Sequence, residues 1–81
     1  MAKPSPTYNG AIELIALGRV IREIRSMQGL SQEGLANQIG IDRSYMGGVE
    51  RGEHNITLMN IIKIAETLQI SPSDLLKKAK I

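Results

Sequence analysis

Residues 32–51, QEGLANQIGIDRSYMGGVER, carry the pattern that decides the fold. Apolar residues recur there at helical spacing on both sides of Gly40, which predicts two short helices, 32–39 and 43–51, joined by a sharp turn. Gly40 supplies the positive φ that the turn needs, and Ala36 is small where the second helix crosses the first. Five apolar residues complete the packing of the pair: Leu35, Ile39, Ile41, Met46 and Val49.

Two adjacent glycines, Gly47 and Gly48, interrupt the second of these helices. They weaken it by roughly 1.5–2 kcal/mol relative to alanines, and judged locally they indicate a turn. We still predict a helix, because Met46 and Val49 must face the same side and only a helix allows that.

Three more helices are expected around this pair. Residues 11–28 form an amphipathic helix, although Gly18 weakens its N-terminal half and leaves a start near Leu17 open. The apolar face of this helix consists of Leu14, Leu17, Ile21, Ile24 and Met27. A helix over 58–68 has its inner face at Leu58, Ile61, Ile62, Ala65 and Leu68, and a last helix covers 72–80. The predicted class is all-α.

The ends of these helices are marked by particular residue types. Four polar residues stand at N-cap positions, and Pro72 occupies the first turn of the last helix. The expected N-caps are Ser31, Asp42, Thr57 and Ser71, and the expected helix-ending glycines are Gly29, Gly40 and Gly52.

The composition bounds the size and chemistry of the protein. With 81 residues, 42% of them apolar, the chain has room for one domain, which buries only roughly 60% of its unfolded surface. The net charge of +2, from ten basic and eight acidic residues, argues only weakly for a nucleic-acid partner. Absence of cysteine excludes disulfides, thiolate nucleophiles and cysteine-based zinc sites, and it fits a reducing cytoplasm.

Other functional classes find little support. The sequence has no signal peptide, no apolar run that could span a membrane, and no nucleophile–base pair or phosphate-binding loop. We therefore expect no catalytic residues, cofactor, metal, small-molecule ligand or membrane partner. Residues 1–10, MAKPSPTYNG, are expected to form a flexible arm or simply a fraying end.

From Leu17 to Leu76 the chain resembles the lambda-repressor-like, Xre-type helix-turn-helix proteins. Five stretches carry the resemblance: LGRVIREIR from Leu17, GLSQE and LA within 29–36, IDRSY at 41–45, VERG at 49–52 and ISPSDLL at 70–76. IDRSY followed by GVER and NIT is similar to the controller proteins of restriction–modification systems. Gly34 and Gly47 depart from the family pattern, which usually has Glu and Ser there. The resemblance implies a five-helix DNA-binding domain that regulates transcription as a homodimer on a palindromic operator.

In this motif the N-terminal residues of the second helix face the base edges of the major groove. Arg43 is expected to contact O6 and N7 of a guanine, the alternatives being a solvated arginine or an ion pair with Asp42. Ser44 contacts a base or phosphate, or stabilises the helix start. Tyr45 contacts a thymine methyl group and a phosphate, or packs in the core. The glycines at 47 and 48 let the backbone approach DNA closely.

Further DNA contacts are expected at phosphates. Gln32 stands beside the backbone amides that open the first motif helix, and the resemblance implies the same role for it. Three residues of the loop after the second helix complete the predicted set: Arg51, His54 and Asn55. His54 has no partner at metal-ligand spacing, so no metal site is expected there.

The resemblance also implies a structural ion pair, in which Arg25 of the first helix meets Glu50 of the recognition helix. Both residues are therefore left out of the predicted DNA contacts.

A two-fold operator requires a two-fold protein, and a small core gains from a partner. We expect the dimer interface around the last helix, at Ile70, Leu75, Leu76 and Ile81, unless these residues only seal the monomer. The alternative function is an antitoxin-type or phage-type repressor whose main partner is another protein.

Overall fold

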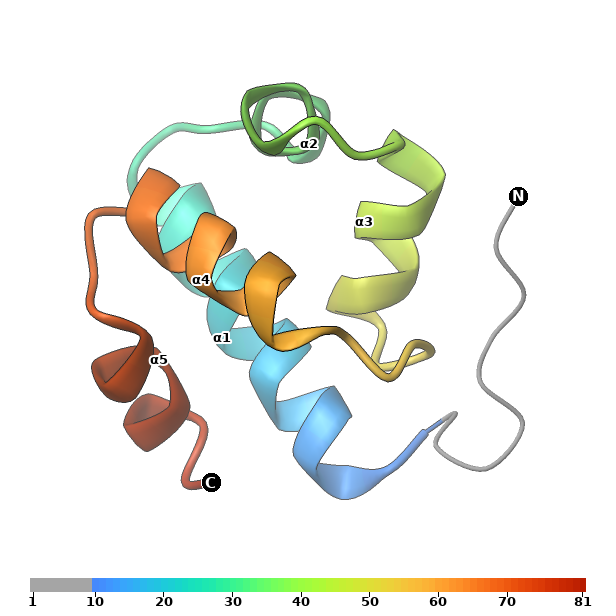
Figure 1. Cartoon of the computed structure of the whole chain (residues 1–81), viewed down its shortest axis with the longest axis vertical. Coiled ribbons are helices and arrows are strands. Elements are labelled where there is room, and N and C mark those ends of the chain that lie inside the picture. Colours follow the sequence, from blue (N-terminus) through green and yellow to red (C-terminus); the bar gives the residue numbers. More distant parts are fainter. Residues whose placement is uncertain (1–9) are drawn as a thin grey trace.

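The fold consists of five helices over residues 10–81, the part of the chain that this computed structural model describes. They are α1 (Ile12–Met27), α2 (Gln32–Ile39), α3 (Arg43–Glu50), α4 (Leu58–Thr67) and α5 (Pro72–Lys78), shown in Figure 1. No strand occurs in these residues, so the all-α prediction is confirmed, with helix ends within two residues of those expected. The arm expected over 1–10 lies outside the described residues, except for Gly10.

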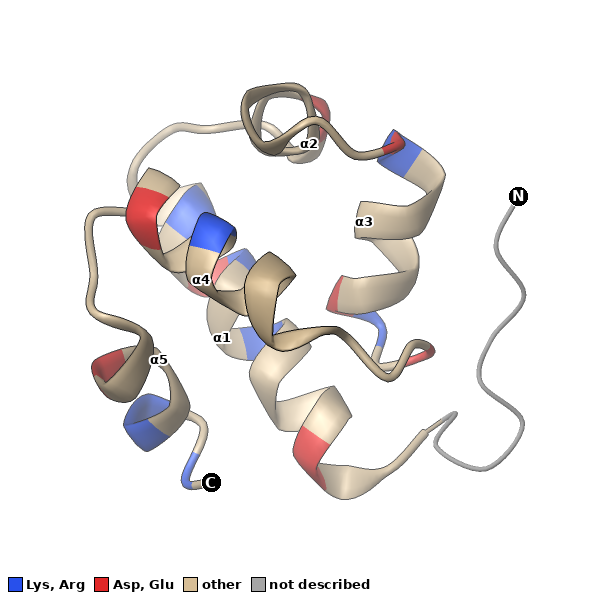
Figure 2. Cartoon of the chain, viewed as in Figure 1, with Lys and Arg blue, Asp and Glu red and all other residues tan. Residues whose placement is uncertain are grey.

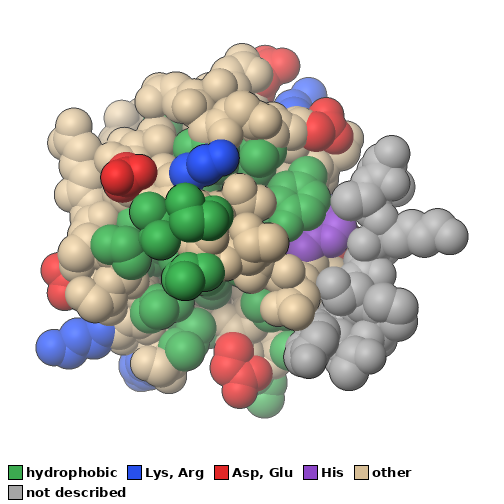
Figure 3. Space-filling view, in the orientation of Figure 1, with side chains coloured by type: hydrophobic (Ala, Val, Ile, Leu, Met, Phe, Trp, Pro, Cys, Tyr) green, Lys and Arg blue, Asp and Glu red, His purple; other side chains and the backbone are tan. Residues whose placement is uncertain are grey.

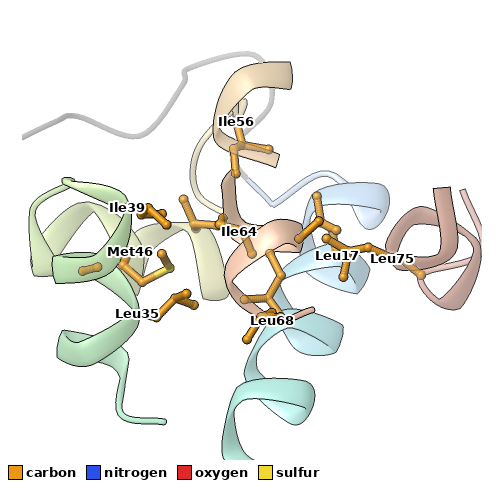
Figure 4. Packing of buried hydrophobic residues seen from close by; sticks show 13 residues of the cluster. Leu17, Leu35, Ile39, Met46, Ile56, Ile64, Leu68 and Leu75 are labelled. Carbon is orange, nitrogen blue, oxygen red and sulfur yellow. The ribbon is translucent and has the colours of Figure 1, made fainter. Parts of the chain in front are cut away.

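Helix α4 occupies the centre of the molecule. Ile64 of α4 lies between two groups of core residues, one from α2 and α3 and one from α1 and α5 (Figure 4). Leu35 and Met46 belong to the first group, and Leu17 and Leu75 to the second, and all of these side chains are buried. One continuous core therefore holds α2 and α3 against the remaining three helices. Within 10–81 no helix is long and apolar enough to cross a lipid bilayer.

Side-chain caps start three of the helices as predicted. Ser31 Oγ accepts a hydrogen bond from the Gly34 N–H at 2.9 Å, and Thr57 and Ser71 make the equivalent bonds at the starts of α4 and α5. Asp42 stands at the N-cap position of α3, but its side chain makes no capping bond, so that prediction is wrong. No Asp42 oxygen therefore accepts a hydrogen bond from the backbone N–H groups in the first turn of α3. Arg43 and Ser44 in this turn are exposed to solvent.

Helical periodicity misplaces two apolar residues. Met27 and Leu58 were assigned to the inner faces of α1 and α4, but they are 87% and 65% exposed. Ile64, which the periodicity left out, is fully buried. The reason is that α4 is buried from two sides, by α2 and by α5, so its inner face is rotated toward Ile64. Met27 lies in the last turn of α1, beyond the helices that cover Ile21.

Gly18 has a packing role that the sequence did not reveal. The glycine was expected to weaken α1 or to delay its start, but the helix begins at Ile12 and runs through it. A Cβ at Gly18 would lie 2.5 Å from the carbonyl oxygens of Val49 and Glu50. The glycine therefore lets the backbone of α1 touch the end of α3.

We predict that Gly18→Ala destabilises the protein even though alanine favours helix formation. Forcing the two backbones apart should cost about 1–3 kcal/mol, measured by urea unfolding. Gly34→Ala is the matched control. It adds the same methyl group to a helix, but the nearest atoms, 3.0–3.1 Å away, belong to the side chains of Ser31 and Leu30, which can move. Equal effects of the two substitutions would contradict the close approach at Gly18.

Candidate nucleic-acid interface

Helices α2 and α3 form the two-helix unit expected from residues 32–51. Gly40 adopts φ +74° at the turn, and the N–H of Ile41 bonds to the carbonyl of Ala36 at 3.0 Å. Met46 and Val49 are 0% and 3% exposed, and they fix α3 on the core. The opposite side of α3 is left facing solvent.

A groove of about 560 Å³ runs between the starts of α2 and α3. Arg43 and Ser44 stand exposed on one wall, and Gln32 and Arg51 reach the same groove. Gly47 also lines the groove, but it is buried, and a Cβ there would lie 3.1 Å from Arg51 Nη1 and 3.3 Å from Gln32 Oε1. The groove thus combines hydrogen-bond donors and two guanidinium groups with one carboxylate, Glu33, on one surface.

Charges of both signs lie along α3 and the loop after it (Figure 2). Arg51 is held by Glu53, with Nε and Nη2 at 2.8 and 3.2 Å from the two carboxylate oxygens. This hydrogen bonding raises the pKa of the Arg51 guanidinium and holds the pKa of the Glu53 carboxyl below its usual value. Because the pair is exposed, solvent screens it, and Arg51 can exchange Glu53 for another anion at little cost.

A second, less exposed ion pair ties three helices together behind the groove. Arg25 of α1 donates to both oxygens of Glu50 at 2.6 and 2.9 Å, and the side chains are only 12% and 4% exposed. Gln32 of α2 donates to the same carboxylate at 3.0 Å, and Arg25 also reaches the carbonyl of Leu30. The hydrogen bond to Glu50 raises the pKa of Arg25. The network fixes the relative positions of α1, α2 and α3.

Residues 21–75 match the helix-turn-helix family. The chain belongs to the helix-turn-helix family of DNA-binding transcriptional regulators. This confirms the resemblance and the function class inferred from the sequence, and members of this family are regulators rather than enzymes.

The relatives include several controller proteins. The chain is 41% identical over 63 residues to control protein C.BamHI of Bacillus amyloliquefaciens, covering 76% of this chain and 78% of the relative. It is 42% identical over 62 residues to control protein C.SmaI of Serratia marcescens, with coverages of 76% and 74%. The crystal structure of the restriction–modification controller protein C.AhdI from Aeromonas hydrophila superposes with a TM-score of 0.74 at 53% identity, covering 76% of this chain and 94% of that one.

Four of the residues predicted to contact DNA line one groove in the structure: Gln32, Arg43, Ser44 and Arg51. Asn55 is exposed in the loop before α4. Tyr45 is half-buried, and its ring stacks on His54 with centroids 4.5 Å apart and planes 16° from parallel.

The burial of His54 contradicts its predicted position in an exposed clamp. Its side chain is only 7% exposed, between the Tyr45 ring and Gly48 of α3, and it is coloured purple in Figure 3. A Cβ at Gly48 would lie 2.6 Å from Cδ2 of His54. Gly48 therefore serves ring packing rather than a close approach to DNA. Gly47 is buried as well, beneath the side chains of Gln32 and Arg51, so neither glycine exposes backbone for such an approach.

One basic residue near the groove was missed. Arg22 is exposed on α1 and lines a second hollow together with Gln32, Gly47 and Arg51. It lies three residues before Arg25 on the same face of α1, so helical spacing from the ion-pair residue is the signal that could have found it. Its position extends the cationic surface from α3 onto α1.

We predict that Glu50→Gln destabilises the fold by about 3 kcal/mol, since it leaves Arg25 poorly paired in a site of low solvent access. Urea unfolding followed by circular dichroism measures the loss. Glu53→Gln is the matched control, because it removes the same charge from the exposed pair with Arg51 and should change stability little. Equal losses in the two variants would mean that the Arg25–Glu50 pair has no special structural role.

Proposed function

We propose that this chain is a homodimeric regulator that binds a palindromic operator and controls the genes of a restriction–modification system. The observation that carries the proposal is the exposed pair Arg43–Ser44 at the N-terminus of a helix fixed by the core and by the Arg25–Glu50 pair. Two relatives are named control proteins, and this supports the proposal that the chain controls a restriction–modification system. We propose no catalytic activity, and the cytoplasm is the proposed place of action.

In the proposed complex the start of α3 enters the major groove. Arg43 reads O6 and N7 of a guanine, and Ser44 contacts an adjacent base or phosphate. Gly47 leaves room for the side chains of Gln32 and Arg51, which lie over it at the groove. Tyr45 presents one edge of its ring, since the other face is held by His54.

Further proposed contacts, to DNA phosphates, surround Arg43 and Ser44 at the start of α3. In the free protein the ion pair with Glu53 keeps the Arg51 side chain ordered. In the proposed complex Arg51 leaves Glu53 and binds a phosphate instead. Gln32 and Asn55 lie on either side of α3, and Arg22 adds a cation from α1. His54 acts indirectly, by orienting Tyr45.

The proposed dimer uses a surface different from the one first expected. Leu75 is fully buried in the monomer core, so it cannot form an interface, and Ile70 and Leu76 are half-buried against that core. Instead, hydrophobic side chains gather over α4 in the face shown in Figure 3. We assign the interface to this α4 patch, defined by the exposed Leu58 and Met59 and the half-buried Ile62. Ile81 of the first expected set is 57% exposed and remains a proposed contact.

Selection of bound DNA from a random pool, followed by binding titrations on the selected site, tests the function. Arg43→Ala should lose about 1–3 kcal/mol on that site and relax the preference at one base position. Arg19→Ala removes the same charge from α1, away from the groove between α2 and α3, and should keep the preference intact. Recovery of no consensus, or an unchanged preference in Arg43→Ala, would refute the proposed reading by α3.

Sedimentation tests the dimer. Leu58→Glu and Met59→Glu should yield folded monomers that lose affinity for the full operator, because charges replace apolar contacts in the interface. Ile12→Glu, at a site 81% exposed on α1, is the matched control and should remain dimeric. Leu75→Glu should instead unfold the chain. A dimer that survives both α4 substitutions would place the interface elsewhere.

A further inference from the structure

A second groove, of about 760 Å³, lies on the outer side of α1 next to α5. It is distinct from the groove between α2 and α3, and the two share no lining residue. Its apolar part is formed by Val20, Ile24 and Met27, which follow one another at intervals of four and three residues along α1. Met27 is 87% exposed, more than any other large apolar side chain reported for residues 10–81. Together with the half-buried Val20 and Ile24 it forms a contiguous apolar strip, and contiguous exposed apolar patches mark interaction sites.

The rim of this groove is predominantly basic. Arg19, Arg22 and Lys78 line it, against a single carboxylate, Glu23. Two copies of this chain meeting there about a two-fold axis would bring the same positive rims together, which disfavours self-association. The apolar strip along its wall is equally unsuited to a DNA phosphate backbone. An amphipathic helix with acidic flanks satisfies both features.

We propose that this groove is the docking site for an acidic amphipathic helix of another protein. The three apolar residues span seven positions of α1, or about 10 Å, which matches two turns of a helix with apolar residues at i, i+3 or i+4, and i+7. Acidic residues beside that stripe pair with Arg19 and Lys78. Arg22 lines both this groove and the hollow beside Gln32 and Arg51, so the docked helix lies next to bound DNA. The site gives the regulator a protein contact while its operator is occupied.

A labelled 16-residue probe peptide, with leucines at helical spacing and glutamates elsewhere, tests the site by fluorescence anisotropy. We expect saturable binding to the full chain that Met27→Glu weakens by about tenfold or more, because the substitution removes the most exposed apolar contact of the strip. Arg19→Glu and Lys78→Glu should weaken binding as well. Ile12→Glu is the matched control outside the groove, and it should bind the peptide with the affinity of the unsubstituted chain. The unsubstituted protein saturated with operator DNA should also bind the peptide with that affinity.

Several results would overturn the proposal. A scrambled peptide of the same composition that binds equally well would show that only charge is recognised. Displacement of the peptide by operator DNA would place it on the groove between α2 and α3. Conversion of the dimer to a monomer by Met27→Glu would make the groove a contact between copies of this chain. Binding of the protein to phosphatidylglycerol vesicles that Met27→Glu abolishes would make it a lipid site.

Discussion

The bidentate hydrogen bonding of Arg25 to Glu50 is the interaction on which the geometry of the DNA-facing surface depends. It joins α1 to the last turn of α3, and Gln32 brings the start of α2 to the same carboxylate. Because the side chains are only 12% and 4% exposed, water competes poorly for these groups. The contact is possible because Gly18 lets α1 and α3 approach to backbone distance about two turns earlier along α1. Close backbone packing at Gly18 and the Arg25–Glu50 ion pair therefore both stabilise the contact between α1 and α3.

With its end held in this way, α3 tolerates a composition that would be poor in an isolated helix. Gly47 and Gly48 lower its intrinsic helix propensity, yet each has a defined neighbour in the fold. Gly48 leaves room for the ring of His54, which in turn stacks on Tyr45. Gly47 lies against the side chains of Gln32 and Arg51 at the groove. The cost in helix propensity is therefore offset by tertiary packing at both glycines.

The exposed apolar residues divide the remaining surface into regions with separate proposed roles. Helix α4 carries exposed charges of both signs, Lys63 and Glu66, and its patch suits a second copy of the chain, whereas the groove at Met27 has a predominantly basic rim and suits an acidic partner. Both lie outside the groove between α2 and α3. The three proposed contacts, with DNA, with a second copy of the chain and with a third protein, therefore use different surfaces, and Arg22 lies where the DNA-facing surface meets the groove at Met27.

The sequence by itself determined the helices, the turns, the side-chain caps of α2, α4 and α5, and the residues at the start of the recognition helix, but not the absence of a cap bond from Asp42. These features are local: a serine or threonine oxygen bonds an amide three residues away, and glycine takes a positive φ at a turn. Residue spacing also placed Leu35, Ala36, Met46 and Val49 in the core, where they are found.

Only the tertiary structure decided which apolar residues are buried and which polar residues are exposed to solvent. Leu58 and Met27 satisfy helical periodicity, but no neighbouring helix covers them within residues 10–81. His54 is buried because Tyr45 and Gly48 form a slot for it, and Leu75 is buried because α5 packs on both α1 and α4. Such outcomes depend on contacts between segments far apart in the chain. Periodicity along one helix carries no information about where the other helices lie.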